Sequence, residues 1–128
     1  LDDLARCGTG EPDGRGGWLL RGSKKWIGTA AWSGFTHVFA HVLGDDGKHR
    51  GIGTFTVRQG TPGFLQGPEE LTMGMRGMVQ NTVELHDVRV TAEDLLGEPG
   101  QGMHIAQDAM EFGRTCIAAC AAPMPWWR

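Results

Sequence analysis

Residues 21–30, RGSKKWIGTA, place a large aromatic side chain among small and flexible neighbours. Trp26 follows a Gly-Ser turn signal and two lysines, and it precedes Gly28 and Thr29. An indole offers a broad apolar face and one N–H donor, and glycine lets another planar molecule approach the backbone closely. The segment is predicted to end a short strand, where Trp26 could serve as a platform for an aromatic cofactor. On the residues alone, packing of Trp26 in the core is the favoured interpretation and the platform is the alternative.

Acid–base chemistry has few candidates in this chain. Glu111 and Arg114 lie three residues apart in a helix-like segment, so they share one face and are predicted to be close enough to pair. An exposed pair of this kind contributes only ~0.3–0.5 kcal/mol to stability. Gly113 directly precedes Arg114 and has no side chain that can take a proton.

Histidines and cysteines give no pattern typical of a metal site. His37 and His41 fall on one face of a predicted strand, where a metal pair is conceivable but an exposed strand face is favoured. Cys116 and Cys120 are four residues apart and are interpreted as small buried hydrophobes. Together with Cys7 they make an odd, irregularly spaced set, which predicts a reducing, cytoplasmic setting without disulfides. No metal site is predicted.

Composition narrows the class of protein. The formal net charge is -3 with scattered lysines and arginines, which gives no basic face for nucleic acid. No apolar run approaches the ~20 residues needed to cross a bilayer. The 128 residues include 21 glycines, which separate short apolar runs as in a chain with many turns between strands. We expect a globular chain with no nucleic-acid partner and no membrane span.

The order of the predicted elements defines a fold class. The strands are predicted at residues 18–21, 36–42, 52–57 and 82–90, while residues 64–79 are not assigned. The apolar alternation of the last strand changes phase at Asp87, which predicts a bulge. A helical turn at 91–96, a loop at 97–102 and a helix from 103 to about 122 follow, and Pro123 and Pro125 end the helix.

The predicted fold is mainly β, a small antiparallel β-barrel or sandwich followed by one C-terminal α-helix. Residues 1–96 are assigned to the β domain. Residues 97–128 are assigned to a linker and the first helix of a second, helical domain that is cut short. The chain does not begin with Met, and we expect it to be a fragment.

Five segments resemble motifs of the acyl-CoA dehydrogenase family, in family order over nearly all of the chain. They are GWLLRGSKKWI at 17–27, TPG at 61–63, MGMRG at 73–77, ELHDVRV at 84–90 and LLGEPGQG at 95–102. Residues 2–5 resemble the remnant of a Gly-Ser-Asp stretch of the same family. The resemblance implies the middle β domain of the family and the start of its carboxy-terminal helical domain.

The resemblance also implies a cofactor and a reaction. Family members hold FAD between their domains, and the flavin takes a hydride from the β-carbon of an acyl-CoA thioester while a Glu removes the α-proton. On this basis Trp26, Ile27, Gly28 and Thr29 would contact the flavin. Gly28 replaces the usual Thr or Ser, so the Thr29 hydroxyl or the backbone alone would make that contact.

The resemblance implies a substrate contact but no catalytic residue in this chain. Glu111 and Arg114 resemble an Asp-x-x-Arg segment that contacts substrate in the family. In the branched-chain and long-chain members the catalytic Glu directly precedes this Arg, where Gly113 stands here. The other family arrangement has the base later in the carboxy-terminal domain. The chain alone is therefore expected to be inactive.

The family further implies partners and a pathway. These are an acyl-CoA substrate, an electron acceptor such as an electron-transfer flavoprotein, a homo-oligomeric assembly and a role in fatty acid metabolism. An acyl-CoA oxidase of the same superfamily and a non-catalytic β-sandwich binding module are the alternatives.

Overall fold

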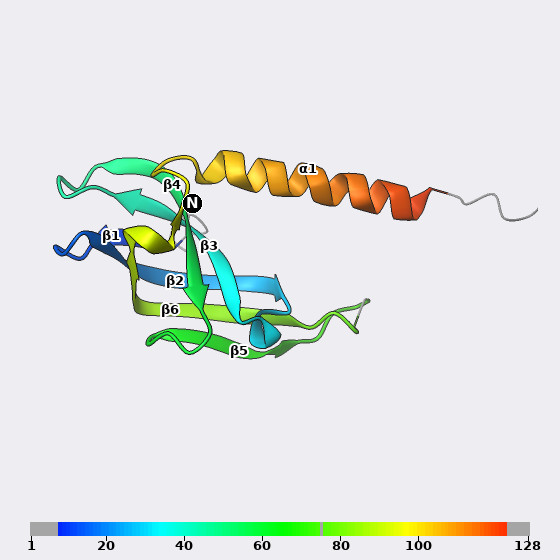
Figure 1. The fold of residues 1–128 in the computed structure, drawn as a ribbon. Helices are drawn as coiled ribbons and strands as arrows, with labels where there is room; N and C mark the ends of the chain where they lie inside the picture. The colour runs from blue at the N-terminus through cyan, green and yellow to red at the C-terminus, as the bar shows by residue number, and fades with distance from the viewer. Residues whose placement is uncertain (1–7, 75, 123–128) are drawn as a thin grey trace, which may run out of the picture.

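Residues 8–74 and 76–122 are described by the computed structural model, and within them the chain forms one seven-stranded sheet and one long helix (Figure 1). This confirms a mainly β fold with a C-terminal helix. The expectations for Cys7, for residues 2–5, for Met75 of the MGMRG segment and for the prolines after the helix lie outside the described residues.

The sheet is antiparallel apart from one strand pair. Its strands are β1 Thr9–Pro12, β2 Gly17–Gly28, β3 Phe35–Leu43, β4 His49–Arg58, β5 Phe64–Glu70, β6 Gln80–Thr91 and β7 Leu95–Leu96. Two 3₁₀ turns, η2 Ala30–Trp32 and η3 Ala92–Asp94, precede β3 and β7, and helix α1 is Gly102–Ala121. The strand order is β5-β6-β2-β1-β3-β4-β7, and β1 pairs with β3 in parallel.

The twist of the sheet carries β3 and β4 across β2 and β6, and the core lies between them (Figure 1). Leu20 of β2 and Phe55 of β4 are 0% exposed and belong to one apolar cluster with residues of β3, β5 and β6. The rings of Trp18 and Phe55 lie 5.5 Å apart within this arrangement. In the described residues the sheet stays open, with β5 and the two-residue β7 at its edges, so closure into a barrel is not confirmed.

Three predicted strands are confirmed, and two further strands lie in segments that the sequence leaves unassigned. β3, β4 and β6 contain the predicted strands and extend them by a few residues. β1 is only four residues long and is held between β2 and β3. β5 is an edge strand that contains Gly67 and Pro68 at a bulge, a position where a proline removes no needed hydrogen bond.

β2 is longer than predicted. The expected turn at Gly22-Ser23 is wrong, because the strand continues to Gly28 and both residues pair with β6. Gly22 adopts a φ of 142° and pairs with Leu85. A long antiparallel pairing with β6 therefore overrides the local turn signal.

The predicted phase change at Asp87 is a β-bulge. β6 has one more residue than β2 between the pairs Leu20–Val88 and Gly22–Leu85. Asp87 itself has a φ of 52° and is exposed, while Leu85 and Val88 on either side of the bulge are both buried. The bulge keeps both halves of β6 facing the core.

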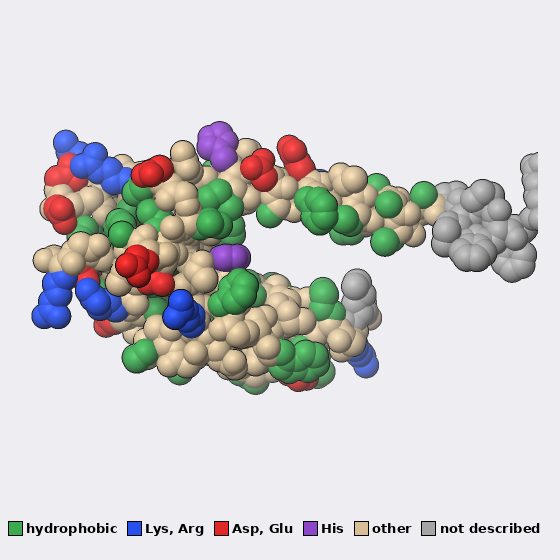
Figure 2. Space-filling model, in the orientation of Figure 1, with side chains coloured by type: hydrophobic (Ala, Val, Ile, Leu, Met, Phe, Trp, Pro, Cys, Tyr) green, Lys and Arg blue, Asp and Glu red, His purple; other side chains and the backbone are tan. Residues whose placement is uncertain are grey.

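Helix α1 begins one residue before its predicted start and packs on β4 through its first turn. Gly102 is buried, and a Cβ atom there would lie 2.6 Å from the carbonyl oxygen of Ile52, so only glycine allows this approach. The remainder of α1 stands clear of the sheet (Figure 2). Cys116 and Cys120 lie on that part and are exposed free thiols, so the expectation of burial is wrong.

The carboxylate of Asp13 organises the turn between β1 and β2. It accepts hydrogen bonds from the backbone N–H of Arg15 at 2.7 Å and of Gly17 at 2.9 Å, and from Nε of Arg89 at 2.7 Å. The two backbone donors, Arg15 first, and then the Arg89 guanidinium hold the pKa of Asp13 below its ordinary value.

We predict that Asp13→Asn removes a pH-dependent part of the stability. A carboxylate with a lowered native pKa stabilises the fold above its unfolded pKa, roughly 3.9, and this contribution is lost as the pH falls through the native value. Urea unfolding of the two proteins between pH 7 and pH 2 measures it. The difference in unfolding free energy should shrink below about pH 4, and a difference that is constant across this range would contradict the assignment.

Candidate functional site

A β-bulge in β2 shapes the segment that carries Trp26. Between the pairs Lys24–Val83 and Ile27–Asn81, β2 has two residues where β6 has one. The extra residue interrupts the regular in-and-out alternation at Trp26, whose side chain is 58% exposed. The interpretation of Trp26 as a core residue is therefore wrong.

Backbone strain is concentrated in the same segment. Trp26 has a φ of 61° and Thr29 a φ of 55°, and Asp87 is the third non-glycine residue with positive φ among the described residues. A bulky side chain in this region is an outlier, and such a residue costs of order 1–3 kcal/mol. The fold holds an exposed indole in an unfavourable backbone conformation, which marks this segment as a candidate functional site.

Buried hydrogen bonds hold the chain just after Trp26 in place. Asn81 is 1% exposed, and its Oδ1 accepts from the backbone N–H of Ala31 at 3.1 Å while its Nδ2 donates to the carbonyl of Gly67 at 3.2 Å. The backbone N–H of Thr29 donates to the carbonyl of Val79 at 2.7 Å. Asn81 thus ties η2 and β5 to β6.

The sequence reasoning missed Asn81. Its only signal is a polar residue in phase with the buried Val83 and Leu85 of the same strand. A buried amide in such a position needs partners for both of its ends, so it often anchors irregular backbone.

We predict that Asn81→Leu lowers the unfolding free energy by about 1–3 kcal/mol, because it leaves the half-buried N–H of Ala31 and the half-buried carbonyl of Gly67 without their partner. Gln59→Leu is the matched control, since Gln59 reaches the carbonyl of Ala31 from the surface at 3.4 Å and should change stability by less than about 0.5 kcal/mol. Denaturant unfolding measures both variants. Equal losses in the two would argue against the anchoring role.

The four residues predicted to contact a cofactor are not equivalent in the structure. Ile27 packs against the core cluster, so its side chain is turned away from the exposed edge. An added Cβ at Gly28 would meet only the side-chain amide of Gln80, at 3.8 Å. The hydroxyl of Thr29 donates to the carbonyl of Gly28 at 2.8 Å, so its proton is already used within the chain. The open surface here consists of the Trp26 indole and the backbone around Gly28.

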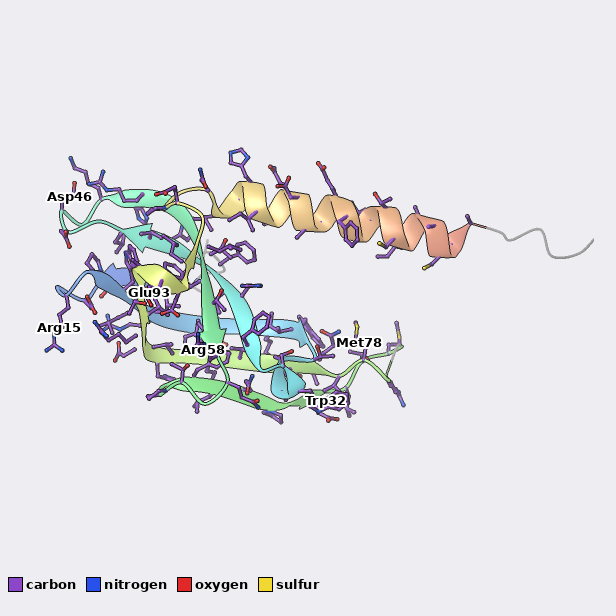
Figure 3. All side chains as sticks on the ribbon, viewed as in Figure 1. Arg15, Trp32, Asp46, Arg58, Met78 and Glu93 are labelled. Carbon is purple, nitrogen blue, oxygen red and sulfur yellow. The ribbon has the colours of Figure 1, made fainter. Side chains whose placement is uncertain are left out.

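Apolar side chains extend this surface. Trp32 is 67% exposed and Met78 is 42% exposed, and both lie toward one end of the sheet, near the β2–η2 connection (Figure 3). Exposed indole and thioether groups close to a strained segment favour contact with a planar apolar molecule over contact with water.

Glu111 and Arg114 lie on α1, and both side chains are exposed. The predicted pair is not formed: the ion pairs found in the described residues do not include one between them. Gly113 between them is half-buried, and an added Cβ would meet nothing within 4 Å. No hydrogen bond or ion pair among the described residues links the side chain of Glu111 or Arg114 to Trp26.

The described ranges contain neither a metal-binding cluster nor a membrane-spanning helix. No three His, Cys, Asp or Glu side chains among residues 8–74 and 76–122 gather closely enough to hold a metal ion. No helix in that part of the chain has the length and apolar character required to cross a membrane.

Residues 3–88, which include the bulged β2 and nearly all of the sheet, match the family "Acyl-CoA dehydrogenase, middle domain". The chain belongs to the acyl-CoA dehydrogenase family.

Individual relatives agree with this assignment. The mitochondrial short-chain specific acyl-CoA dehydrogenase of Rattus norvegicus is 36% identical over 104 residues, which are 81% of this chain and 25% of that protein. Butyryl-CoA dehydrogenase of Megasphaera elsdenii has a solved structure that matches 88% of this chain and 29% of its own with 33% identity and a TM-score of 0.77. An acyl-CoA dehydrogenase of Bacillus anthracis, complexed with FAD, matches 88% of this chain and 19% of its own with 32% identity and a TM-score of 0.75. The chain spans about a quarter of the length of the curated relatives it matches.

Proposed function

We propose that this chain supplies the middle β domain, residues 1–96, and the first carboxy-terminal-domain helix, residues 97–128, of a flavin-dependent acyl-CoA dehydrogenase. The observation that carries the proposal is the exposed, left-handed Trp26 on a bulge of β2. The relatives named above support it, and one of them is a complex with FAD.

The end of β2 that carries Trp26 and Gly28 extends beyond its pairing with β1, and we propose that the flavin binds there. Trp26 would pack its indole face against the ring system. The backbone around Gly28 would face the ring edge, since among the described residues only the side-chain amide of Gln80 comes near a Cβ built at Gly28, at 3.8 Å. Thr29 would contribute through a lone pair of its hydroxyl oxygen, because the hydroxyl proton goes to the carbonyl of Gly28 and the backbone N–H goes to the carbonyl of Val79. Bound FAD supplies the hydride acceptor for α,β-dehydrogenation of an acyl-CoA thioester.

Helix α1 would contribute to substrate binding and not to proton transfer. Glu111 and Arg114 are exposed and unpaired with each other, so both are free to meet an acyl-CoA or a neighbouring helix. Gly113 leaves no carboxylate directly before Arg114. The catalytic base would come from a part of the protein outside this chain.

The proposal includes partners. The reduced cofactor would pass electrons to an acceptor such as an electron-transfer flavoprotein, within a homo-oligomeric, cytoplasmic enzyme of fatty acid metabolism. Helix α1 exposes Met110, Phe112 and Ile117 on the part that stands clear of the sheet, and these would pack against further helices of the same domain.

The proposal is tested by comparing the isolated 128-residue chain with a complete enzyme that contains it. The 128-residue chain is expected neither to retain FAD at micromolar concentration nor to oxidise an acyl-CoA, because half of the cofactor contacts and the base lie elsewhere. Transplanting residues 8–122 into the matching part of the Megasphaera elsdenii enzyme should restore flavin binding and acyl-CoA-dependent dye reduction. A folded chimera without flavin would sink the proposal, and peroxide formation in place of dye reduction would favour an acyl-CoA oxidase.

A further inference from the structure

The β3–β4 hairpin brings two histidines into contact. The ring centroids of His41 and His49 lie 5.9 Å apart, and the rings are nearly perpendicular at 85°. His41 pairs with Ile52, and His49 pairs with Leu43 across a register shift. Directly opposed residues of antiparallel strands share a face, and Leu43 lies two residues beyond His41, so both imidazoles project from the same outer face of the hairpin.

This pair differs from the one that the sequence suggests. His37 shares a strand with His41, but its Nδ1 lies 3.1 Å from the hydroxyl of Thr56. Within residues 8–74 and 76–122 neither His41 nor His49 has a side-chain hydrogen bond. His49 is exposed and His41 half-buried, so one ring is held by the sheet while the other can adjust its rotamer.

Two imidazoles on rigid neighbouring strands suit a borderline divalent cation. Imidazole nitrogen is a preferred ligand of Zn²⁺, Cu²⁺ and Ni²⁺, with metal–nitrogen distances of about 2.0–2.1 Å for zinc. The 5.9 Å between the ring centroids is comparable with the separation of two imidazoles that share one ion, and the exposed His49 ring can turn a nitrogen toward His41. Lys48 and Arg50 of the hairpin would repel a metal cation, but both are paired with the carboxylate of Asp46, at 4.0 and 3.2 Å. This pairing reduces their repulsion.

We propose that His41 and His49 chelate a divalent transition-metal ion, of which Ni²⁺ and Cu²⁺ are the tightest-binding candidates, on the outer face of the β3–β4 hairpin. Water completes the coordination, since the described residues provide no third His, Cys, Asp or Glu at this position. The site is separate from the Trp26 segment, which lies on β2.

Titration with Ni²⁺ by calorimetry tests this site, in the 128-residue chain with its three cysteines replaced by serine. The replacement is needed because the exposed thiols Cys116 and Cys120, four residues apart on α1, would themselves bind the metal. One ion should bind, and His49→Asn should weaken its binding by about tenfold or more, which corresponds to ~1.4 kcal/mol. His41→Asn should have the same effect, and the double variant should be no weaker than either single one, because a single imidazole does not chelate. His104→Asn on exposed α1 is the control and should leave the affinity unchanged.

Independent effects of the two substitutions, an equal loss in His104→Asn, or full affinity in the double variant would each overturn the proposal. Circular dichroism of the variants guards against misfolding. His49→Asn alters an exposed side chain and should keep the native spectrum. Its Ni²⁺ affinity therefore tests the proposal even if His41→Asn perturbs the fold.

Discussion

The Trp26→Gly variant is expected to be more stable than the Trp26→Ala variant by about 1 kcal/mol, although both lose the indole. A left-handed backbone costs an L-residue roughly 1–2 kcal/mol, and glycine is free of most of that penalty while losing ~0.5–1 kcal/mol of chain entropy. The φ of 61° at Trp26 places this position in the left-handed region. Urea unfolding of the 128-residue chain measures the difference. An alanine variant as stable as the glycine variant would show that the strain is absent in solution.

The same two variants are expected to lower FAD affinity about tenfold or more in a flavin-binding protein that contains this chain. Aromatic packing beyond area burial contributes ~0.5–1.5 kcal/mol, and the apolar area of the indole adds to it. Leu65→Ala is the control, because Leu65 is also an exposed apolar side chain but lies on β5, outside the bulge and outside the surface around Trp26. If Trp26 had a structural role, the Trp26→Gly variant would have a lower unfolding free energy than the unsubstituted protein. Loss of flavin with gain of stability in Trp26→Gly would identify a residue that the fold maintains for binding.

The Phe55→Ala variant is expected to lose about 3–5 kcal/mol, a large part of the ~5–15 kcal/mol typical of a domain. Phe55 is 0% exposed, and its ring contacts Trp18 across the core. A Cβ at Gly53 would lie 3.1 Å from this ring and one at Gly10 3.8 Å, so the first of these two glycines makes room for the ring and the second position is in ordinary contact with it. Backbone surrounds the ring on these sides, so the cavity left by alanine has little freedom to collapse.

Phe35→Ala provides the comparison for this loss. Phe35 is 55% exposed and touches the ring of His37 at a centroid distance of 5.3 Å. Its removal should change the unfolding free energy by less than about 1 kcal/mol. Chemical denaturation measures the unfolding free energy of both variants. Similar decreases in the two would mean that the core does not centre on Phe55.

The sequence predicted those strands in which apolar and polar residues alternate in step with burial in the structure. In β6 the phase change at Asp87 is visible because valines and leucines on both sides face the core. β1 and β5 could not be found in this way, since each consists largely of glycine, proline and acidic residues, and each is held by its neighbours. The extension of β2 through Gly22-Ser23 likewise depends on pairing with β6, which no local signal reports.

The candidate site was predictable in part. Its residue types single out Trp26, and the family resemblance points to the same segment. The bulge and the left-handed backbone result from register against β6, and the anchoring by Asn81 depends on contacts with η2 and β5, so neither follows from the order of residues alone. The burial expected of Cys116 fails for a related reason: the apolar pattern of α1 does not tell which surface covers it.

The central claim is that Trp26 is held on its bulge in order to contact a flavin. A crystal structure of an FAD-bound protein that contains this chain tests it most directly. The account predicts the Trp26 indole within van der Waals distance of the flavin ring, about 3.5–4.0 Å between carbon atoms, with the backbone still left-handed. A flavin ring bound elsewhere, or an indole turned into the core in that complex, would contradict it.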